Sequence, residues 1–220
     1  MVSETLVIEV VSDVICPWCY VGKRRLEKAL AILRDEFSAR IRWLPFELNP
    51  AMPRQGMDRG EYRKAKFGSE ARSQALEGHV AGEGLKEGLA FAFDRMKRVP
   101  NTFDAHRLIW LADEAGCQDA VVEALFRAYF LEAEDVGDPA VLSRIAAENG
   151  IPPEFVEGCA AVAQVRLAEQ QAYDSGITGV PYFRANGRPV ASGALEGAAL
   201  ADALRRAVRG EQMRRLLTLA

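Results

Sequence analysis

A cysteine pair between a predicted strand and a predicted helix constrains the fold of this chain more than any other feature. Residues 16–19 read Cys-Pro-Trp-Cys, and the β-branched segment 6–12 just before them predicts a buried strand. The segment that follows, up to residue 37, is apolar on one helical face and charged on the other, which predicts an amphipathic helix. A second strand is predicted at residues 41–46. Strand, helix and strand of these lengths indicate a right-handed βαβ unit with a parallel strand pair.

The two cysteines occupy positions at which the start of a helix can activate one of them. If the helix begins at Cys16, this residue is the N-cap, Pro17 is the first helical residue and Cys19 is the third. A Cys16 thiolate would then face the free amides of Trp18 and Cys19 at the positive end of the helix dipole, which lowers a thiol pKa. This makes Cys16 the candidate nucleophile and Cys19 the candidate resolving thiol. The alternative is that both are ordinary core residues.

The middle of the chain has a different pattern from its two ends. Between residues 58 and 175 strand patterns vanish and apolar helical faces recur. After this block, short strands are predicted on both sides of Asn186-Gly187, a strong hairpin signal, and an amphipathic helix follows. The chain is therefore predicted to be an α/β frame with a large helical block set into it.

Gly179-Val180-Pro181 is a second unusual segment. Proline cannot donate a ladder hydrogen bond, so it is unexpected at the start of a strand unless the backbone turns there. A cis Val180–Pro181 bond would make such a turn and leave the Val180 backbone free to pair with an extended peptide. An ordinary trans proline that starts a strand is the alternative, and spacing alone does not decide between them.

Composition and charge argue against several classes of function. The formal net charge of −3 gives no electrostatic basis for binding nucleic acid or a membrane surface. No apolar run approaches the roughly 18–20 residues that span a bilayer. The first residues do not read as a secretory signal, so we expect a cytoplasmic protein. The four cysteines contain one close pair, whereas a zinc site needs four suitably spaced ligands, so we expect no metal.

Taken together, these segments resemble the DsbA superfamily of thioredoxin-fold proteins, in particular its FrnE-like branch. The similarity spans nearly the whole chain. The matching segments are residues 16–24 (CPWCYVGKR), 45–50 (PFELNP), 100–102 (PNT), 104–107 (DAHR) and 176–181 (GITGVP). The resemblance implies an α/β thioredoxin fold built from residues 1–57 and 176–220, with an inserted all-helical domain at residues 58–175.

The resemblance also implies an activity, thiol–disulfide oxidation, reduction or isomerisation, and a cis Pro181 that faces Cys16. Protein or small-molecule thiols and disulfides are the implied partners, for a monomer or a homodimer. No cofactor is expected beyond the redox-active Cys16–Cys19 disulfide, with glutathione as a potential co-substrate. The residues expected to contact the substrate are Pro17, Trp18, Val180 and Pro181.

Trp18 marks a departure from DsbA itself, which is exported and carries histidine between the proline and the second cysteine. With tryptophan in this place, the Cys16 thiolate has one stabilising partner fewer. We therefore expect a less oxidising couple than that of DsbA. A redox titration against glutathione checks this, and a midpoint as positive as that of DsbA would contradict it.

Two other functions stay open at this point. Kappa-class glutathione transferases and 2-hydroxychromene-2-carboxylate isomerases belong to the same superfamily, but they carry serine in place of Cys16 and lack the resolving cysteine. The alternative function is thus a glutathione-dependent isomerase or transferase acting on a small aromatic substrate. A redox-sensing domain without turnover is the non-enzymatic possibility.

Several other residues are weaker candidates. Asn49, Asn101 and His106 could form a polar lining that faces the cysteine pair, although Asn101 could equally cap a helix. The basic stretch between residues 54 and 66 could attract an anionic substrate or glutathione carboxylates, but short mixed-charge runs are typical of a solvated helix face. We expect Cys117 and Cys159 to be buried and inert.

Overall fold

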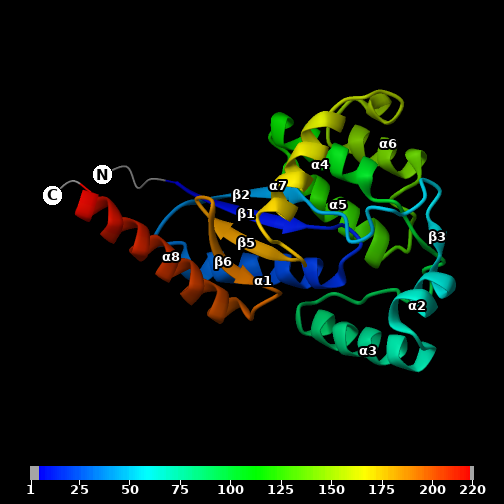
Figure 1. The fold of residues 1–220 in the computed structure, drawn as a ribbon, viewed down its shortest axis with the longest axis horizontal. Coiled ribbons are helices and arrows are strands. Elements are labelled where there is room, and N and C mark those ends of the chain that lie inside the picture. The colour runs from blue at the N-terminus through cyan, green and yellow to red at the C-terminus, as the bar shows by residue number, and fades with distance from the viewer. Residues whose placement is uncertain (1–4, 219–220) are drawn as a thin grey trace.

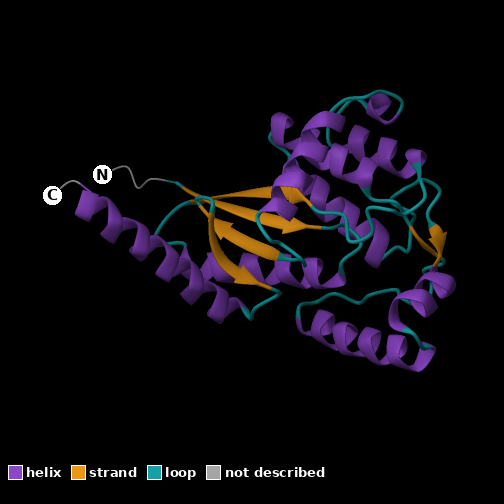
Figure 2. Cartoon of the chain, in the orientation of Figure 1, coloured by secondary structure: helices purple, strands orange, loops and turns teal. Residues whose placement is uncertain are grey.

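The computed structural model describes residues 5–218, which form a small mixed sheet surrounded by helices (Figures 1 and 2). In chain order the elements are β1 (Leu6–Ser12), α1 (Pro17–Leu33), β2 (Ala39–Pro45), β3 (Met57–Asp58), α2 (Arg59–Phe67), α3 (Glu70–Lys86), β4 (Arg98–Val99), α4 (Phe103–Ala115), α5 (Gln118–Phe130), α6 (Pro139–Glu148), the 3₁₀ turn η1 (Pro153–Val156), α7 (Val162–Asp174), β5 (Tyr182–Ala185), β6 (Arg188–Ser192) and α8 (Gly197–Thr218). Within this part of the chain, no helix is both long and apolar enough to cross a membrane.

The central sheet has the strand order β2-β1-β5-β6. β1 pairs with β2 in parallel, from Leu6 opposite Ala39 to Ser12 opposite Pro45, and pairs with β5 in the antiparallel sense. This confirms the predicted βαβ unit. The predicted hairpin is also confirmed, because Asn186 and Gly187 join β5 to β6 with φ of 48° and 76°, as a tight turn between twisted strands requires. The sheet places the end of β1, and the cysteine pair that follows it, beside the start of β5.

Helix α1 packs against several other parts of the α/β frame. Leu26, Ala29 and Leu33 are fully buried on one of its faces, and Leu30 is partly buried beside them. α1 packs along α8, which leads away from the sheet in Figure 1. At the other end of α1, Gly22 lies against the loop before β5, because a Cβ there would be 3.0 Å from Pro181 Cγ. The absence of a side chain at this position lets the helix that carries the cysteines approach the proline loop closely.

The helical insertion is fixed to α1 by both apolar and polar contacts. Tyr20 of α1 stacks on Phe126 of α5 with ring centroids 4.9 Å apart, and its hydroxyl donates to Glu123. Lys23, 4% exposed, pairs with three carboxylates, two of them on α5. Helices α4 to α7 gather in one group, and α2 and α3 form a separate hairpin beside the N-terminal end of α1 (Figure 2). The domain boundaries at residues 57/58 and 175/176 remain predictions.

A two-stranded ribbon interrupts the insertion, which we had predicted to be wholly helical. β3 pairs with β4 over only two residues each, Met57 opposite Val99 and Asp58 opposite Arg98. Strands this short carry no alternating pattern, so the sequence does not reveal them. Gly56 permits the pairing, because its φ is +71° and a Cβ would lie 2.6 Å from the Val99 carbonyl oxygen. Asp58 then caps α2 by accepting from the Glu61 amide.

Candidate active site

The helix start at Cys16 has the predicted geometry, but the cysteine side chain makes a different contact. Cys16 is the N-cap of α1 with φ −90° and ψ 110°, and Pro17 occupies the first helical position. The side chain accepts no hydrogen bond from the helix amides. The Cys19 amide instead donates to the backbone carbonyl of Cys16 at 2.9 Å. The Cys16 thiol donates to the carbonyl of Val180 at 3.6 Å.

This contact brings together two segments that are 164 residues apart in the sequence. The Val180–Pro181 bond is cis, as the family resemblance implied. Pro181 follows directly and packs near Gly22 of α1, so Cys16 is enclosed between its own helix and the loop before β5. The predicted substrate-contacting residues therefore do lie around the nucleophile candidate.

The environment makes the two thiols unequal. Cys19 is fully buried, and burial together with the neighbouring Cys16 thiol raises the pKa of Cys19 well above its usual value. Hydrogen bonds from Ser12 and from the Asp13 backbone oppose this shift only in part. Cys16 is 5% exposed but lines an open cavity. Cys16 thus faces the cavity, whereas Cys19 is not among the described residues that line it.

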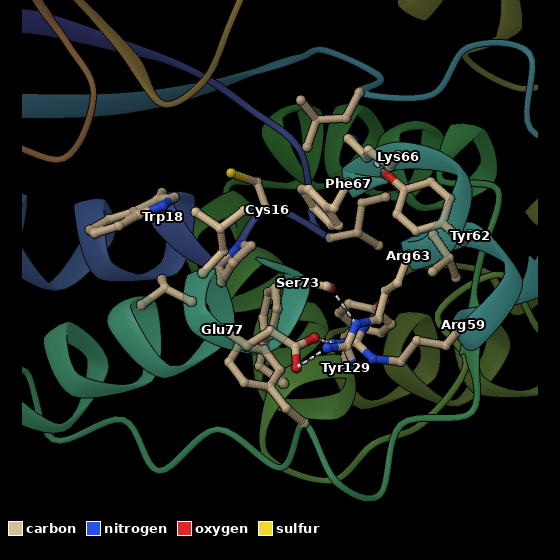
Figure 3. Close-up of a pocket in the computed structure, with 18 of the residues that line it drawn as sticks. Cys16, Trp18, Arg59, Tyr62, Arg63, Lys66, Phe67, Ser73, Glu77 and Tyr129 are labelled. Carbon is tan, nitrogen blue, oxygen red and sulfur yellow. Dashed lines mark hydrogen bonds and ion pairs between the residues drawn. The ribbon is translucent and has the colours of Figure 1, made fainter. Parts of the chain in front are cut away.

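The cavity beside Cys16 has a volume of about 330 Å³ (Figure 3). Cys16 and Trp18 lie on one side and α2 lies across from them, while Glu77 and other residues of α3 complete the wall. Most of the wall is apolar, with Phe67 and Phe93 among its members. The volume falls within the range of about 300–1,000 Å³ that is typical of small-ligand pockets.

Arg59, Arg63 and Lys66 of the basic stretch supply part of this wall. Arg54, Lys64 and Lys66 are exposed, as our interpretation of the stretch as a solvated helix face predicts, but Arg59 and Arg63 are not. The side chains of Arg59 and Arg63 are only 13% and 20% exposed, and both pair with Glu77 of α3. Arg63 Nε also donates to Ser73 Oγ at 2.6 Å. For these two arginines the prediction was wrong because α3 folds back over α2 and covers the face on which they lie, a contact that local charge patterning does not show.

The three candidate lining residues lie elsewhere. Asn101 is structural, since its side chain accepts from the Phe103 amide and donates to the Met52 carbonyl. Asn49 accepts from the hydroxyl of Tyr62 at 3.0 Å, outside the cavity. His106 is buried behind the cysteine pair, where Nε2 lies 3.4 Å from Asp13 Oδ1. None of the three is among the described residues that line the cavity.

Sequence reasoning missed the contribution of α3. Glu77 bridges both arginines, and the His79 ring lies 5.5 Å from the Trp18 ring in a tilted arrangement. A histidine therefore stands beside the cysteine motif even though the motif itself has none. The contact was not predictable, because α3 lies far along the chain from Trp18 and no local pattern links the two.

The remaining cysteines take no part in the site. Cys117 is half-buried, and its thiol donates to the Asn149 carbonyl at 3.6 Å. Cys159 is exposed, which corrects the expectation that it would be buried. Among the residues that the structure describes, no group of three histidine, cysteine or acidic side chains is placed to hold a metal ion.

A cluster of buried titratable groups lies on the far side of Asp13. Burial, followed by the charge of Glu169, raises the pKa of Glu47 from its usual value near 4.5 to about 7. Burial disfavours a charged His106, but Asp13, Glu169 and Glu47 outweigh it and raise the pKa of His106. Arg166, which is half exposed, pairs with both glutamates.

Glu47 makes stability depend on pH in a direction that can be measured. The folded chain holds a proton on Glu47 that the unfolded chain has lost above its usual pKa, so this group's contribution is complete below about pH 4.5 and disappears as the pH rises through about 7. Glu47→Gln keeps the neutral state at all pH values. We therefore expect the free energy of unfolding of the Glu47→Gln variant, minus that of the unmodified chain, to increase between about pH 5 and pH 8.

Denaturant unfolding at several pH values measures this difference. Glu157→Gln is the control, because Glu157 is exposed and shows no contact of this kind. A Glu47→Gln difference that stays constant with pH, like that of the control, would contradict the assignment.

Comparisons with known proteins agree with this geometry. The model of the DsbA-like thioredoxin domain matches residues 7–205. The crystal structure of the probable DsbA oxidoreductase SCO1869 from Streptomyces coelicolor is 34% identical, with a TM-score of 0.82 over 92% of this chain and 89% of that one. The uncharacterized protein YwbO of Bacillus subtilis (strain 168) is 25% identical over 96% of this chain and 100% of its own length.

A more distant structure shares the fold alone. The cytosolic disulfide reductase DsbM from Pseudomonas aeruginosa is 19% identical, with a TM-score of 0.58 over 96% of this chain and 99% of that one. A structure of the same protein with GSH has a TM-score of 0.54. The match of the family model over most of the chain, the 34% identity to SCO1869 and the placement of the cysteine pair lead to one conclusion. The chain belongs to the DsbA-like thioredoxin domain family.

Proposed function

We propose that this protein is a thiol–disulfide oxidoreductase in which Cys16 is the nucleophile and Cys19 the resolving thiol. The observation that carries the proposal is the asymmetry of the pair: Cys16 lines a cavity, and Cys19 is fully buried behind it. Membership of the DsbA-like family supports redox activity. The cis Val180–Pro181 bond beside Cys16 supports a substrate position between the helix start and β5.

The proposed reaction is two successive thiol–disulfide exchanges. The Cys16 thiolate attacks one sulfur of the substrate disulfide, forming a mixed disulfide and releasing the other half as a thiolate. Cys19 loses its proton and attacks Cys16 sulfur, which releases the second half and leaves the Cys16–Cys19 disulfide. The substrate gains two electrons and the protein loses two. Two equivalents of a small thiol such as glutathione return the pair to the dithiol form.

The burial of Cys19 has a consequence for the order of these steps. Because burial raises its pKa, Cys19 stays protonated until Cys16 is bound in the mixed disulfide. Bond formation at Cys16 removes the Cys16 thiol and its charge, both of which raise the pKa of Cys19. The first exchange thereby favours deprotonation of the resolving thiol for the second.

The net direction and the compartment belong to the proposal as well. DsbM, which has the same fold, is named a cytosolic disulfide reductase and has been crystallised with GSH. We propose the same direction here, reduction of disulfides in the cytoplasm at the expense of a thiol pool. The tryptophan between the two cysteines supports a reducing couple, because it adds no positive charge beside Cys16.

Trapping with Cys19→Ser tests the order of attack. The mixed disulfide on Cys16 has no resolving thiol in this variant, so we expect it to accumulate when the reduced protein meets oxidised insulin or glutathione disulfide. Intact-mass spectrometry measures the adduct, and peptide mapping places it on Cys16. Cys159→Ser is the control, since this exposed thiol lies outside the site and its loss should change nothing. An adduct located on another cysteine would contradict the assignment of Cys16 as nucleophile.

A glutathione-dependent isomerase or transferase is the second candidate. The mostly apolar cavity beside Cys16 favours it, because a small aromatic substrate could bind there. This candidate predicts isomerisation or conjugation that survives Cys19→Ser, whereas the oxidoreductase requires Cys19 for turnover. The same variant therefore separates the two functions.

A further inference from the structure

We propose that the cavity beside Cys16 selects small disulfides and thiols that combine an apolar, aromatic body with a carboxylate. The inference rests on the proposed oxidoreductase function, and it names the substrate class of the same nucleophile. It is carried by three observations: the position of Cys16 in the wall, the apolar lining next to it, and a row of cations across from it.

Access is the first observation. Cys16 contributes to the cavity wall, and Cys19 does not. The volume of about 330 Å³ is at the lower end of the range of about 300–1,000 Å³ for small-ligand pockets. A ligand of one aromatic ring and its substituents fits this space, with its sulfur directed to Cys16.

The lining is the second observation. Trp18 and Pro17 lie next to Cys16, and Phe67, Leu76 and Val80 come from the α2–α3 hairpin. Aromatic rings and aliphatic chains gain affinity from such a wall through burial of apolar surface, at about 25 cal/mol per Å². A polar peptide backbone would lose hydrogen bonds to water here without replacing them.

The cations are the third observation. Arg59, Arg63 and Lys66 are spaced four and three residues apart, so they share one face of α2, and all three line the cavity across from Cys16 and Trp18 (Figure 3). Glu77 is the only carboxylate among the described residues of the wall. The cavity therefore carries an excess of two positive charges in a chain whose formal net charge is −3.

The three cations differ in their partners, because both arginines pair with Glu77 and Lys66 pairs with no acidic side chain among the described residues. Arg59 Nε and Arg63 Nη2 are buried and make no hydrogen bond, although Arg63 Nη2 lies 3.0 Å from Glu77 Oε2 as an ion pair. Lys66 Nζ contacts the Tyr62 hydroxyl and Asn49 Oδ1, and no carboxylate among the described side chains. Lys66 is exposed and lines the cavity, so a bound carboxylate can accept from its Nζ, and charge-assisted hydrogen bonds of this kind are strong.

The test uses two aromatic disulfides that differ in charge. Dithiobis(nitrobenzoate) is anionic and dithiodipyridine is neutral. The Cys16 thiolate breaks the S–S bond of either and forms a mixed disulfide; the leaving group is nitrothiobenzoate from the first and, after protonation, thiopyridone from the second, and each is measured by its absorbance. In a chain with Cys19, Cys117 and Cys159 replaced by serine, Cys16 is the only thiol. For this chain we divide the rate with the anionic disulfide by the rate with the neutral one, and we compare this ratio with the ratio measured for mercaptoethanol. The fraction of thiol present as thiolate affects both rates of a given thiol equally, so it cancels in each ratio.

We expect the protein to favour the anionic disulfide at least tenfold more than mercaptoethanol does, since a hydrogen bond to a charged group is worth a factor of about ten or more. Lys66→Met should remove most of this preference. Lys64→Met is the matched control, because it removes the same charge from the same helix at a position that does not line the cavity. The arginines are left intact because their pairs with Glu77 hold α2 to α3.

Two results would overturn the inference. One is a rate ratio equal to that of mercaptoethanol, and the other is an equal loss in the Lys66→Met and Lys64→Met variants, which would assign the preference to overall charge. A calorimetric titration of Cys16→Ser with nitrobenzoate, against uncharged nitrobenzamide, measures selection without any chemistry. Selective binding combined with no disulfide turnover in the unmodified protein would overturn the proposed function and leave the cavity assignment standing. Turnover of insulin without selective binding would overturn the cavity assignment and leave the proposed function standing.

Discussion

Replacing Cys16 by serine is expected to abolish disulfide exchange. Serine fits the site, because a hydroxyl at the N-cap can also donate to the Val180 carbonyl that the thiol contacts at 3.6 Å. A serine hydroxyl without an adjacent base is not a nucleophile toward disulfides, and removing a covalent nucleophile costs on the order of 10³-fold or more in rate. The glutathione-coupled reduction of insulin measures the loss.

Two comparisons make this loss interpretable. Cys19→Ser should also stop turnover, but it should accumulate the mixed disulfide, which Cys16→Ser cannot form. The thermal unfolding midpoint of Cys16→Ser should stay close to that of the unmodified chain, which separates a lost reaction from a lost fold. Turnover within about tenfold of the unmodified enzyme in Cys16→Ser, a loss far below that expected for a covalent nucleophile, would remove Cys16 from the mechanism.

Replacing Arg25 by methionine is expected to cause the largest loss of stability. Its side chain is 4% exposed and binds Glu83 of α3, Glu87 at the C-cap of this helix, and Glu196. It also donates to the Ala194 carbonyl at 2.7 Å. One guanidinium thus joins α1 to the helix that covers the cavity and to the segment that leads into α8. Removing one partner of a buried ion pair costs about 3–5 kcal/mol when the other charge is left buried, and Glu87 is the partner of Arg25 that is buried, with 3% of its side chain exposed.

The partner that Glu87 keeps after the loss of Arg25 places the expected loss of stability at the lower end of that range. Glu87 is 3% exposed and keeps Lys28 as a partner at 2.6 Å after Arg25 is gone. The free energy of unfolding, from denaturant titration, should fall by about 3 kcal/mol. Arg205→Met is the control: Arg205 pairs with Glu36 and Asp202 near the surface, where such pairs contribute about 0–1 kcal/mol. Equal losses in the two variants would show that the Arg25 cluster is not a structural junction.

Several elements were predictable because their causes are local. β-branched residues before Cys16 and an apolar helical face after Pro17 specify β1 and α1 through backbone preference and periodicity. Asn186 and Gly187 specify the β5–β6 hairpin because they tolerate positive φ. Asp138 caps α6 by accepting from the Ala140 amide, with Pro139 in the first turn, a residue pair that by itself favours a helix start.

The site was less predictable where its contacts cross long stretches of chain. The residues around Arg63 have the composition that is typical of a solvated helix face. Arg63 is covered only because α3 folds back over α2 and places Glu77 against it. His106 was a candidate for the lining, yet packing places it behind the cysteines against Asp13. Cys159 was expected to be buried with Cys117, but it follows a 3₁₀ turn at the surface, where a small thiol gives no signal.

By itself, the sequence determined the βαβ unit, the hairpin, and the placement of Cys16 and Cys19 at the start of a helix. These follow from hydrogen bonds and apolar periodicity within a few residues of each other. Only the tertiary structure decided that Val180 meets Cys16, that Cys19 is sealed from solvent, and that a row of cations faces the nucleophile across an apolar cavity. These depend on packing between segments separated by up to 164 residues, where burial, and not local preference, sets the environment of each charge and thiol.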